Sequence, residues 1–193
     1  MKSKKKLLLL ILIFAACMGG AAVLYRQLGD GIALEQLETE TPHQSKETAK
    51  DETPQRTKAP DFVVYDADGS EVRLSDFAGK PVILNFWASW CGPCQMEMPD
   101  FHKKYQELGK DIQFLMINIT DGSRETVETA SRFIAEKGYL FPVFYDTQSN
   151  ATSAYGAYSL PTTFFIDAEG YAIAQAIGAI DEETLQRGID MIR

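Results

Sequence analysis

The feature that most constrains the fold is a nearly continuous apolar run at residues 82–87, which is soon followed by a C-x-x-C sequence from Cys91 to Cys94. A strand of this composition is typical of a sheet that is covered by helices on both faces. Beyond the cysteines, apolar side chains recur at spacings of three and four, which predicts a helix that ends near Leu108. The cysteine pair should therefore lie where a central strand passes into a helix.

The remaining pattern predicts alternating strands and helices. We expect a hairpin over residues 62–74, strands at 112–119, 143–145, 162–166 and 171–177, and helices at 124–137, 151–155 and 181–192. Parallel neighbours need helical crossovers, whereas the last two strands can pair antiparallel across a tight turn. The predicted fold class is α/β, with a mixed central sheet and helices on both of its faces.

The N-terminal segment has the features of a membrane anchor. Residues 7–25 carry no charge, and a helix of that length spans about 28 Å at ~1.5 Å per residue, which is close to the hydrocarbon thickness. The lysines before it predict a cytoplasmic basic tail at residues 1–6 and an exported C-terminal part. We expect a transmembrane signal-anchor at 7–25; a lipoprotein signal that ends at Cys17 and a cleaved secretory signal are the alternatives.

Composition changes twice after this segment. Residues 26–57 are rich in Glu, Thr, Gln, Lys and Pro, which predicts a flexible linker, and residues 58–193 hold the predicted domain with its N-terminal hairpin. The formal net charge of the chain is −8, and the five basic residues before residue 27 have no acidic counterpart there. The acidic remainder would repel phosphate backbones, so nucleic-acid binding is not expected.

The cysteine pair carries the predicted chemistry. At a helix N-terminus, unpaired N–H groups favour a thiolate, so Cys91 is the expected attacking sulfur and Cys94 the resolving one. Pro93 removes a donor that the first helical turn could not satisfy. The third cysteine is Cys17, and the two histidines are far apart in the chain, so neither a zinc site nor any other cofactor is expected.

Two separated motifs resemble the thioredoxin superfamily. The stretch from Phe86 to Cys94 is similar to the thioredoxin active-site sequence, and Leu160-Pro161-Thr162 resembles its cis-proline segment. The resemblance implies a thioredoxin-like fold, a cis bond before Pro161, and a substrate groove shaped by Trp90 and Pro161. It also implies that the neighbouring residues Gly92, Pro93 and Leu160 contribute to substrate binding.

Two departures from thioredoxins, Asn85 with Glu97 and a longer central segment, point to the ResA/TlpA-like, membrane-anchored branch. Thioredoxins carry an Asp six residues before the first cysteine, where this chain has Asn85, which cannot titrate. Glu97, within Cys94-Gln95-Met96-Glu97-Met98-Pro99, matches the Glu of the C-x-x-E-x-P sequence of that branch. The resemblance implies that Glu97 assists thiol proton transfer. The predicted helix at 124–137 and the strand after it form a longer central insertion than in minimal thioredoxins.

The expected function is reduction of disulfides in exported client proteins by an extracytoplasmic thiol–disulfide oxidoreductase. By resemblance, electrons would come from a membrane donor of the CcdA/DsbD type. The clients would be apocytochrome c thiols, methionine sulfoxide reductases or peroxidases. Three alternatives stay open: a disulfide-forming oxidant, a peroxiredoxin-like antioxidant, and a redox-inert binding module. The peroxiredoxin alternative fits less well, because those enzymes place their cysteine in a T-x-x-C context and this chain has Ala88-Ser89-Trp90-Cys91.

Overall fold

The computed structural model describes residues 56–193. The predicted basic tail at 1–6, the predicted anchor at 7–25 and all but the end of the predicted linker at 26–57 lie outside the described residues. Within residues 56–193, no helix combines the length and the apolar character needed to cross a membrane.

One mixed sheet organises the described residues. Its strands follow the order β1-β8-β7-β4-β5-β6-β2-β3, with β4 at the centre, parallel to β5 and antiparallel to β7. The strands are β1 (Thr57–Lys58), β2 (Val63–Tyr65), β3 (Glu71–Arg73), β4 (Val82–Trp87), β5 (Gln113–Asn118), β6 (Val143–Tyr145), β7 (Thr162–Ile166) and β8 (Tyr171–Ile177).

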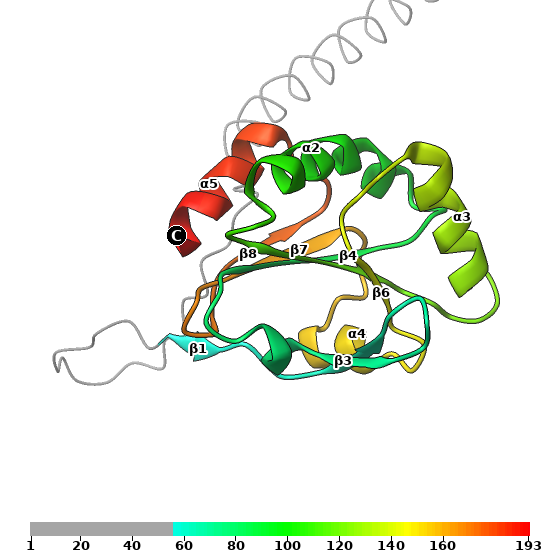
Figure 1. Ribbon diagram of the computed structural model, residues 1–193, viewed down its shortest axis with the longest axis horizontal. Helices are drawn as coiled ribbons and strands as arrows, with labels where there is room; N and C mark the ends of the chain where they lie inside the picture. Colours follow the sequence, from blue (N-terminus) through cyan, green and yellow to red (C-terminus); the bar gives the residue numbers. More distant parts are fainter. Residues whose placement is uncertain (1–55) are drawn as a thin grey trace, which may run out of the picture. The chain divides into compact units, whose positions relative to one another are not determined.

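Helices cover both faces of this sheet, as predicted (Figure 1). The helices are α2 (Gly92–Leu108), α3 (Val127–Lys137), α4 (Asn150–Tyr155) and α5 (Glu182–Ile192), together with a 3₁₀ helix at Leu74–Phe77. Helices α2, α3 and α5 pack on one face and α4 on the other; the β2–β3 hairpin, which continues the sheet beyond β6, lies on the same side as α4 (Figure 1).

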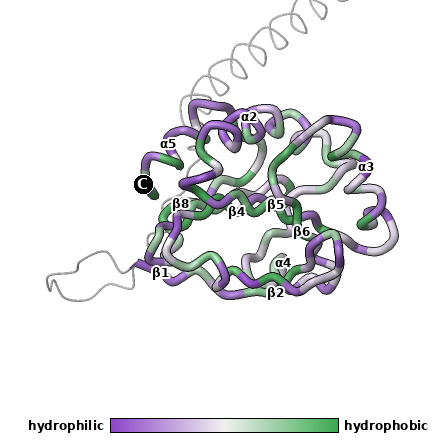
Figure 2. Tube along the Cα trace, viewed as in Figure 1, coloured by the Kyte–Doolittle hydropathy of each residue, from purple (hydrophilic) through white to green (hydrophobic). Residues whose placement is uncertain are grey.

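Strand β4 explains why two cores form. All six of its residues are buried, and their side chains alternate between the two faces. Ile83 and Trp87 belong to the core under α2, whereas Leu84 and Phe86 belong to the core over α4. The central strands accordingly form the hydrophobic middle of the molecule, with the hydrophilic residues outside (Figure 2). Asn85 faces the α2 side with Ile83 and Trp87, which puts a buried amide beneath the helix that carries the cysteines.

Two differences from the sequence-based expectation concern element ends. Thr57, which was predicted to be linker, lies in β1 and pairs with Ala172 of β8. A two-residue edge strand has no periodicity of its own, so its pairing was not predictable from the local sequence. Helix α3 begins at Val127 rather than at residue 124, because Thr126 acts as its N-cap and accepts a hydrogen bond from the Thr129 N–H. Arg124 and Glu125 therefore belong to a loop.

Candidate active site

The two cysteines lie at the N-terminus of α2 and form a disulfide, with 5.3 Å between their Cα atoms. Cys91 is the N-cap residue, and its Sγ accepts a hydrogen bond of 3.2 Å from the backbone N–H of Cys94. Cys94 is fully buried, whereas Cys91 keeps 5% of its surface exposed. An N–H donor and the helix dipole would both stabilise a thiolate on Cys91 in the reduced protein. Cys91 is thus the sulfur that an incoming disulfide can reach.

A groove of about 460 Å³ opens beside the exposed edge of Cys91. Its walls come from the cysteine turn, the loop after β5, helix α4 and the segment before β7. The lining residues are Trp90, Cys91, Gly92, Pro93, Ile119, Arg124, Thr152, Tyr158 and Leu160. The predicted substrate-binding residues Trp90, Gly92, Pro93 and Leu160 therefore lie together here.

Pro161 lies beside this groove but does not line it. The Leu160-Pro161 bond is cis, as the resemblance implies. Pro161 itself is buried, and its carbonyl accepts a hydrogen bond of 2.9 Å from the Gly178 N–H. Within this segment, the residue that reaches the groove is Leu160.

The two tryptophans lie in different environments. Trp90 is 41% exposed, which fits a position at the rim of the groove, whereas Trp87 is fully buried in the core, as predicted.

Glu97 is a buried carboxyl on the inner face of α2, one helical turn after Cys94. It is 2% exposed, so it is not the solvated surface carboxylate common on helices. Its Oε1 accepts a hydrogen bond of 2.8 Å from Asn85 Nδ2, and its Oε2 accepts one of 3.0 Å from the Ile180 N–H. Burial raises the pKa of Glu97 to about 7, although both hydrogen bonds favour the carboxylate. A group with this pKa can both take and give a proton near neutral pH.

Asn85 connects Glu97 to the sheet. Its Nδ2 donates to Glu97 and also to Thr163 Oγ1 of β7, at 3.0 Å. Its Oδ1 has no partner among residues 56–193. A neutral amide therefore occupies the strand position that carries an Asp in thioredoxins, and Glu97 is the titratable member of this hydrogen-bond network.

A second buried carboxylate supports the cysteine turn from the other side. Glu125 is fully buried and accepts hydrogen bonds from the N–H and Oγ of Ser89, at 2.9 and 2.7 Å. It also accepts one of 2.8 Å from Asn118 Nδ2 at the end of β5. Sequence reasoning missed Glu125 because the helix was expected to start at residue 124. The N-cap preference of Thr126 is the signal that would have placed Glu125 in the loop before the helix.

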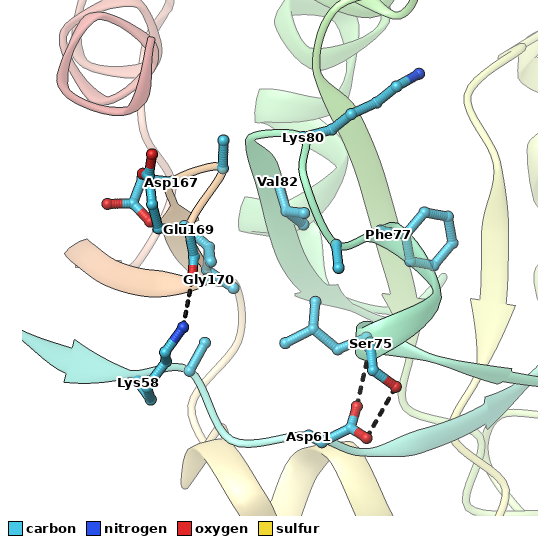
Figure 3. A pocket seen from close by; sticks show the side chains of 14 residues that line it. Lys58, Asp61, Ser75, Phe77, Lys80, Val82, Asp167, Glu169 and Gly170 are labelled. Atoms are coloured by element: carbon cyan, nitrogen blue, oxygen red, sulfur yellow. Dashed lines mark hydrogen bonds between the residues drawn. The ribbon is translucent and has the colours of Figure 1, made fainter.

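A smaller pocket of about 220 Å³ lies at the opposite end of β4, near Val82 and the β7–β8 turn (Figure 3). Its Asp61 carboxylate already accepts hydrogen bonds from the backbone N–H and the hydroxyl of Ser75 (Figure 3). No cysteine lines this pocket. Among residues 56–193, no group of three His, Cys, Asp or Glu side chains is placed to hold a metal ion. The reacting sulfurs and the groove beside them are therefore the candidate active site.

Comparison with known proteins identifies the family. Residues 56–174 match the AhpC/TSA family. The chain belongs to this family. It is 38% identical over 138 residues to the thiol-disulfide oxidoreductase ResA of Geobacillus thermodenitrificans (strain NG80-2), a match that covers 70% of this chain and 76% of that protein. With its Cys91–Cys94 pair, this member of the family is a ResA-like thiol–disulfide oxidoreductase.

Solved structures agree on the fold. A DsbF homologue from Corynebacterium diphtheriae superimposes with a TM-score of 0.66 at 23% identity, over 83% of this chain and 95% of that one. The pneumococcal exposed lipoprotein thioredoxin Etrx1 from Streptococcus pneumoniae strain TIGR4 gives a TM-score of 0.57 at 34% identity, over 68% and 99%. The predicted thioredoxin-like fold is confirmed.

Proposed function

We propose that this protein reduces disulfides in exported client proteins on the outer side of the cytoplasmic membrane. The observation that carries the proposal is the asymmetry of the cysteine pair. Cys91 lines the groove and its sulfur accepts a hydrogen bond from an N–H donor, whereas Cys94 is fully buried and does not line the groove. Cys91 is therefore suited to attack the client disulfide first, and Cys94 to resolve the mixed disulfide afterwards.

In the first step, the Cys91 thiolate of the reduced protein attacks one sulfur of a client disulfide. A mixed disulfide between Cys91 and the client forms, and the other client sulfur leaves as a thiolate that takes up a proton. The groove residues Trp90 and Leu160 hold the client chain beside the sulfur during this attack. The backbone of Leu160, on the groove side of the cis bond, would lie next to the bound client strand, as the thioredoxin resemblance implies.

In the second step, Cys94 loses its proton and attacks Cys91 Sγ, which releases the second client thiolate. Glu97 is the proposed acceptor of the Cys94 proton, because it is the buried carboxyl one turn along α2 and its pKa is about 7. The products are a reduced client and the Cys91–Cys94 disulfide, so two electrons pass from the protein to the client. The structure corresponds to this oxidised product.

The same proposal includes location and electron supply. Residues 7–25 would tether the domain to the membrane, either as a signal-anchor or through a lipid on Cys17. The name of the structural relative Etrx1, an exposed lipoprotein, supports an extracytoplasmic place. A catalyst outside the cytosol must be reduced again after each cycle, so a membrane electron donor of the CcdA/DsbD type is the proposed partner.

Trapping tests the proposed order of attack. A full-length Cys94→Ala variant expressed in its own cell should accumulate a mixed disulfide between Cys91 and a client, which non-reducing isolation would recover. The matched Cys91→Ala variant keeps Cys94, whose sulfur is buried, and should trap little or nothing. If Cys91→Ala traps the same clients as efficiently, Cys91 is not the attacking sulfur and the proposal is wrong.

A further inference from the structure

Arg124 supplies the charge in the groove beside Cys91. The other eight lining residues are uncharged side chains or glycine, and all nine belong to the described part of the chain. A basic group at this place is unexpected from composition, because the chain carries a net charge of −8. The groove therefore combines apolar walls with one cation, close to the reacting sulfur.

The guanidinium of Arg124 is stacked rather than ion-paired. Its Cζ lies 3.7 Å from the centroid of the Trp90 ring, which is a cation–π contact. Within residues 56–193 the structure records no ion pair or hydrogen bond from this guanidinium, whereas four other arginines pair with carboxylates: Arg56, Arg73, Arg132 and Arg187. Stacking occupies one face of the guanidinium and leaves its N–H groups free to form bidentate hydrogen bonds with a carboxylate.

The loop that carries Arg124 is held in place by its own hydrogen bonds. The Glu125 carboxylate binds Ser89 and Asn118, which ties the loop to the cysteine turn and to the end of β5. Asp121 is the neighbouring acid: its Oδ1 accepts hydrogen bonds from the Ser123 and Glu125 N–H groups. These hydrogen bonds, and to a smaller extent the nearby Arg124 charge, lower the pKa of Asp121, but no ion pair joins Asp121 to Arg124 within residues 56–193. Because the loop is fixed, little ordering is needed when a client binds, which favours affinity.

We infer that Arg124 makes the groove select client disulfides that are flanked by an acidic residue. The occupant is an extended client segment whose cysteine reaches Cys91, whose apolar side chains contact Leu160 and Tyr158, and whose carboxylate meets the edge of the guanidinium. This inference deepens the proposed reductase function and rests on it. Arg124 would be a specificity-determining residue, because it would contact the carboxylate of the client and not the sulfur that is attacked.

Peptides of matched sequence test this selection. Three peptides with an internal disulfide would carry Glu, Gln or Lys on both sides of the cysteine pair, and pre-reduced full-length protein in a neutral detergent would reduce them. We expect the second-order rate constant for the Glu peptide to exceed that for the Lys peptide by about fivefold, the size of a partly exposed ion pair. High salt should reduce this ratio, because added ions screen exposed charges.

Variants separate client recognition from other roles of the cation. Arg124→Gln should bring the Glu-to-Lys ratio to about one or below, Arg124→Glu should invert it, and Arg124→Lys should keep part of it. Arg132→Gln, an exposed arginine on α3 outside the groove, should keep the wild-type ratio. If Arg124→Gln slows all three peptides by the same factor, the cation acts on the Cys91 thiolate and the inference is overturned.

The two proposals fail in different ways. Equal rate constants for the three peptides in the wild-type protein would contradict the role of Arg124 while leaving the reductase function intact. A reduced protein that reduces none of the three peptides would contradict the proposed function itself.

Discussion

Asn85 Nδ2 donates a hydrogen bond of 2.8 Å to Glu97 Oε1, so the central strand and the cysteine-bearing helix are joined by a neutral donor and a titratable acceptor. The resemblance to thioredoxins would place an ionisable Asp on the strand. Here the strand carries the amide and the helix carries the acid, whose burial raises its pKa to about 7. The proposed proton acceptor of Cys94 is therefore part of the same helix as the cysteines.

The pH dependence of the second step should follow Glu97. Only the carboxylate form can accept the Cys94 proton, so the rate of mixed-disulfide resolution should rise as the pH increases through about 7. Glu97→Gln should remove this rise and slow resolution at pH 7.5 by roughly a hundredfold or more. Stopped-flow measurement with a pre-formed mixed disulfide would give both quantities. The exposed-carboxyl variant Glu136→Gln serves as the control, and an unchanged profile in Glu97→Gln would contradict the assignment.

Stability should also depend on pH through Glu97. In the folded protein Glu97 keeps its proton up to about pH 7, whereas in the unfolded chain it loses the proton near its ordinary value of 4.5. Between these values the folded state binds more protons, so the free energy of unfolding should fall as the pH rises. The full difference is roughly 3 kcal/mol.

Comparison of wild type with Glu97→Gln isolates this contribution, because the other carboxyls are shared. The glutamine can be accommodated, since Asn85 Oδ1 has no partner among the described residues and an amide flip would turn it toward the new donor. Urea unfolding of the oxidised proteins at pH 5 and pH 8 should show that the free energy of unfolding falls less between these two pH values in the variant than in the wild type. A loss of equal size in both proteins would count against the raised pKa.

Asn85→Asp should weaken the fold most at alkaline pH. The substitution places a second carboxyl within hydrogen-bond distance of Glu97 in a buried site, where two like charges cannot both be ionised at low cost. We expect a loss of about 2–4 kcal/mol at pH 8 and a much smaller one at pH 5, where both groups can be protonated. Thermal unfolding at the two values measures it, and a pH-independent effect would show that only the lost hydrogen bond matters.

Gly188→Ala tests the packing of α5 on the sheet. A Cβ at Gly188 would lie 2.2 Å from the Phe165 ring of β7, and both residues are buried. We expect a destabilisation of about 1–3 kcal/mol from overpacking. Met191→Ala on the exposed side of the same helix is the control and should change the unfolding free energy by less than about 0.5 kcal/mol. Equal effects of the two substitutions would mean that α5 is not packed closely at Gly188.

Much of the architecture was predictable because it follows from local patterns. The apolar run of β4, the periodicity of α2 and the turn residues around the β7–β8 hairpin each indicate an element within a short window, and the structure contains all three. The cysteine pair and the cis bond before Pro161 were predictable from motifs.

The site beyond those motifs depends on contacts between distant parts of the chain. Glu125 binds Ser89, 36 positions away, and Glu97 binds the Ile180 N–H, 83 positions away. Neither contact has a local sequence pattern, so the burial of Glu97 and the supporting role of Glu125 could not be derived before the fold was known. The position of Arg124 over Trp90 was missed for the same reason.

The equilibrium reduction potential of the Cys91–Cys94 pair tests the central claim most directly, because it decides whether the protein gives or takes electrons. The full-length protein would be equilibrated with defined redox buffers, and the fraction of free thiols would be measured by alkylation. The reductase account predicts a potential near that of thioredoxin, about −270 mV. A value near −120 mV, as in a strong disulfide-forming oxidant, would contradict it.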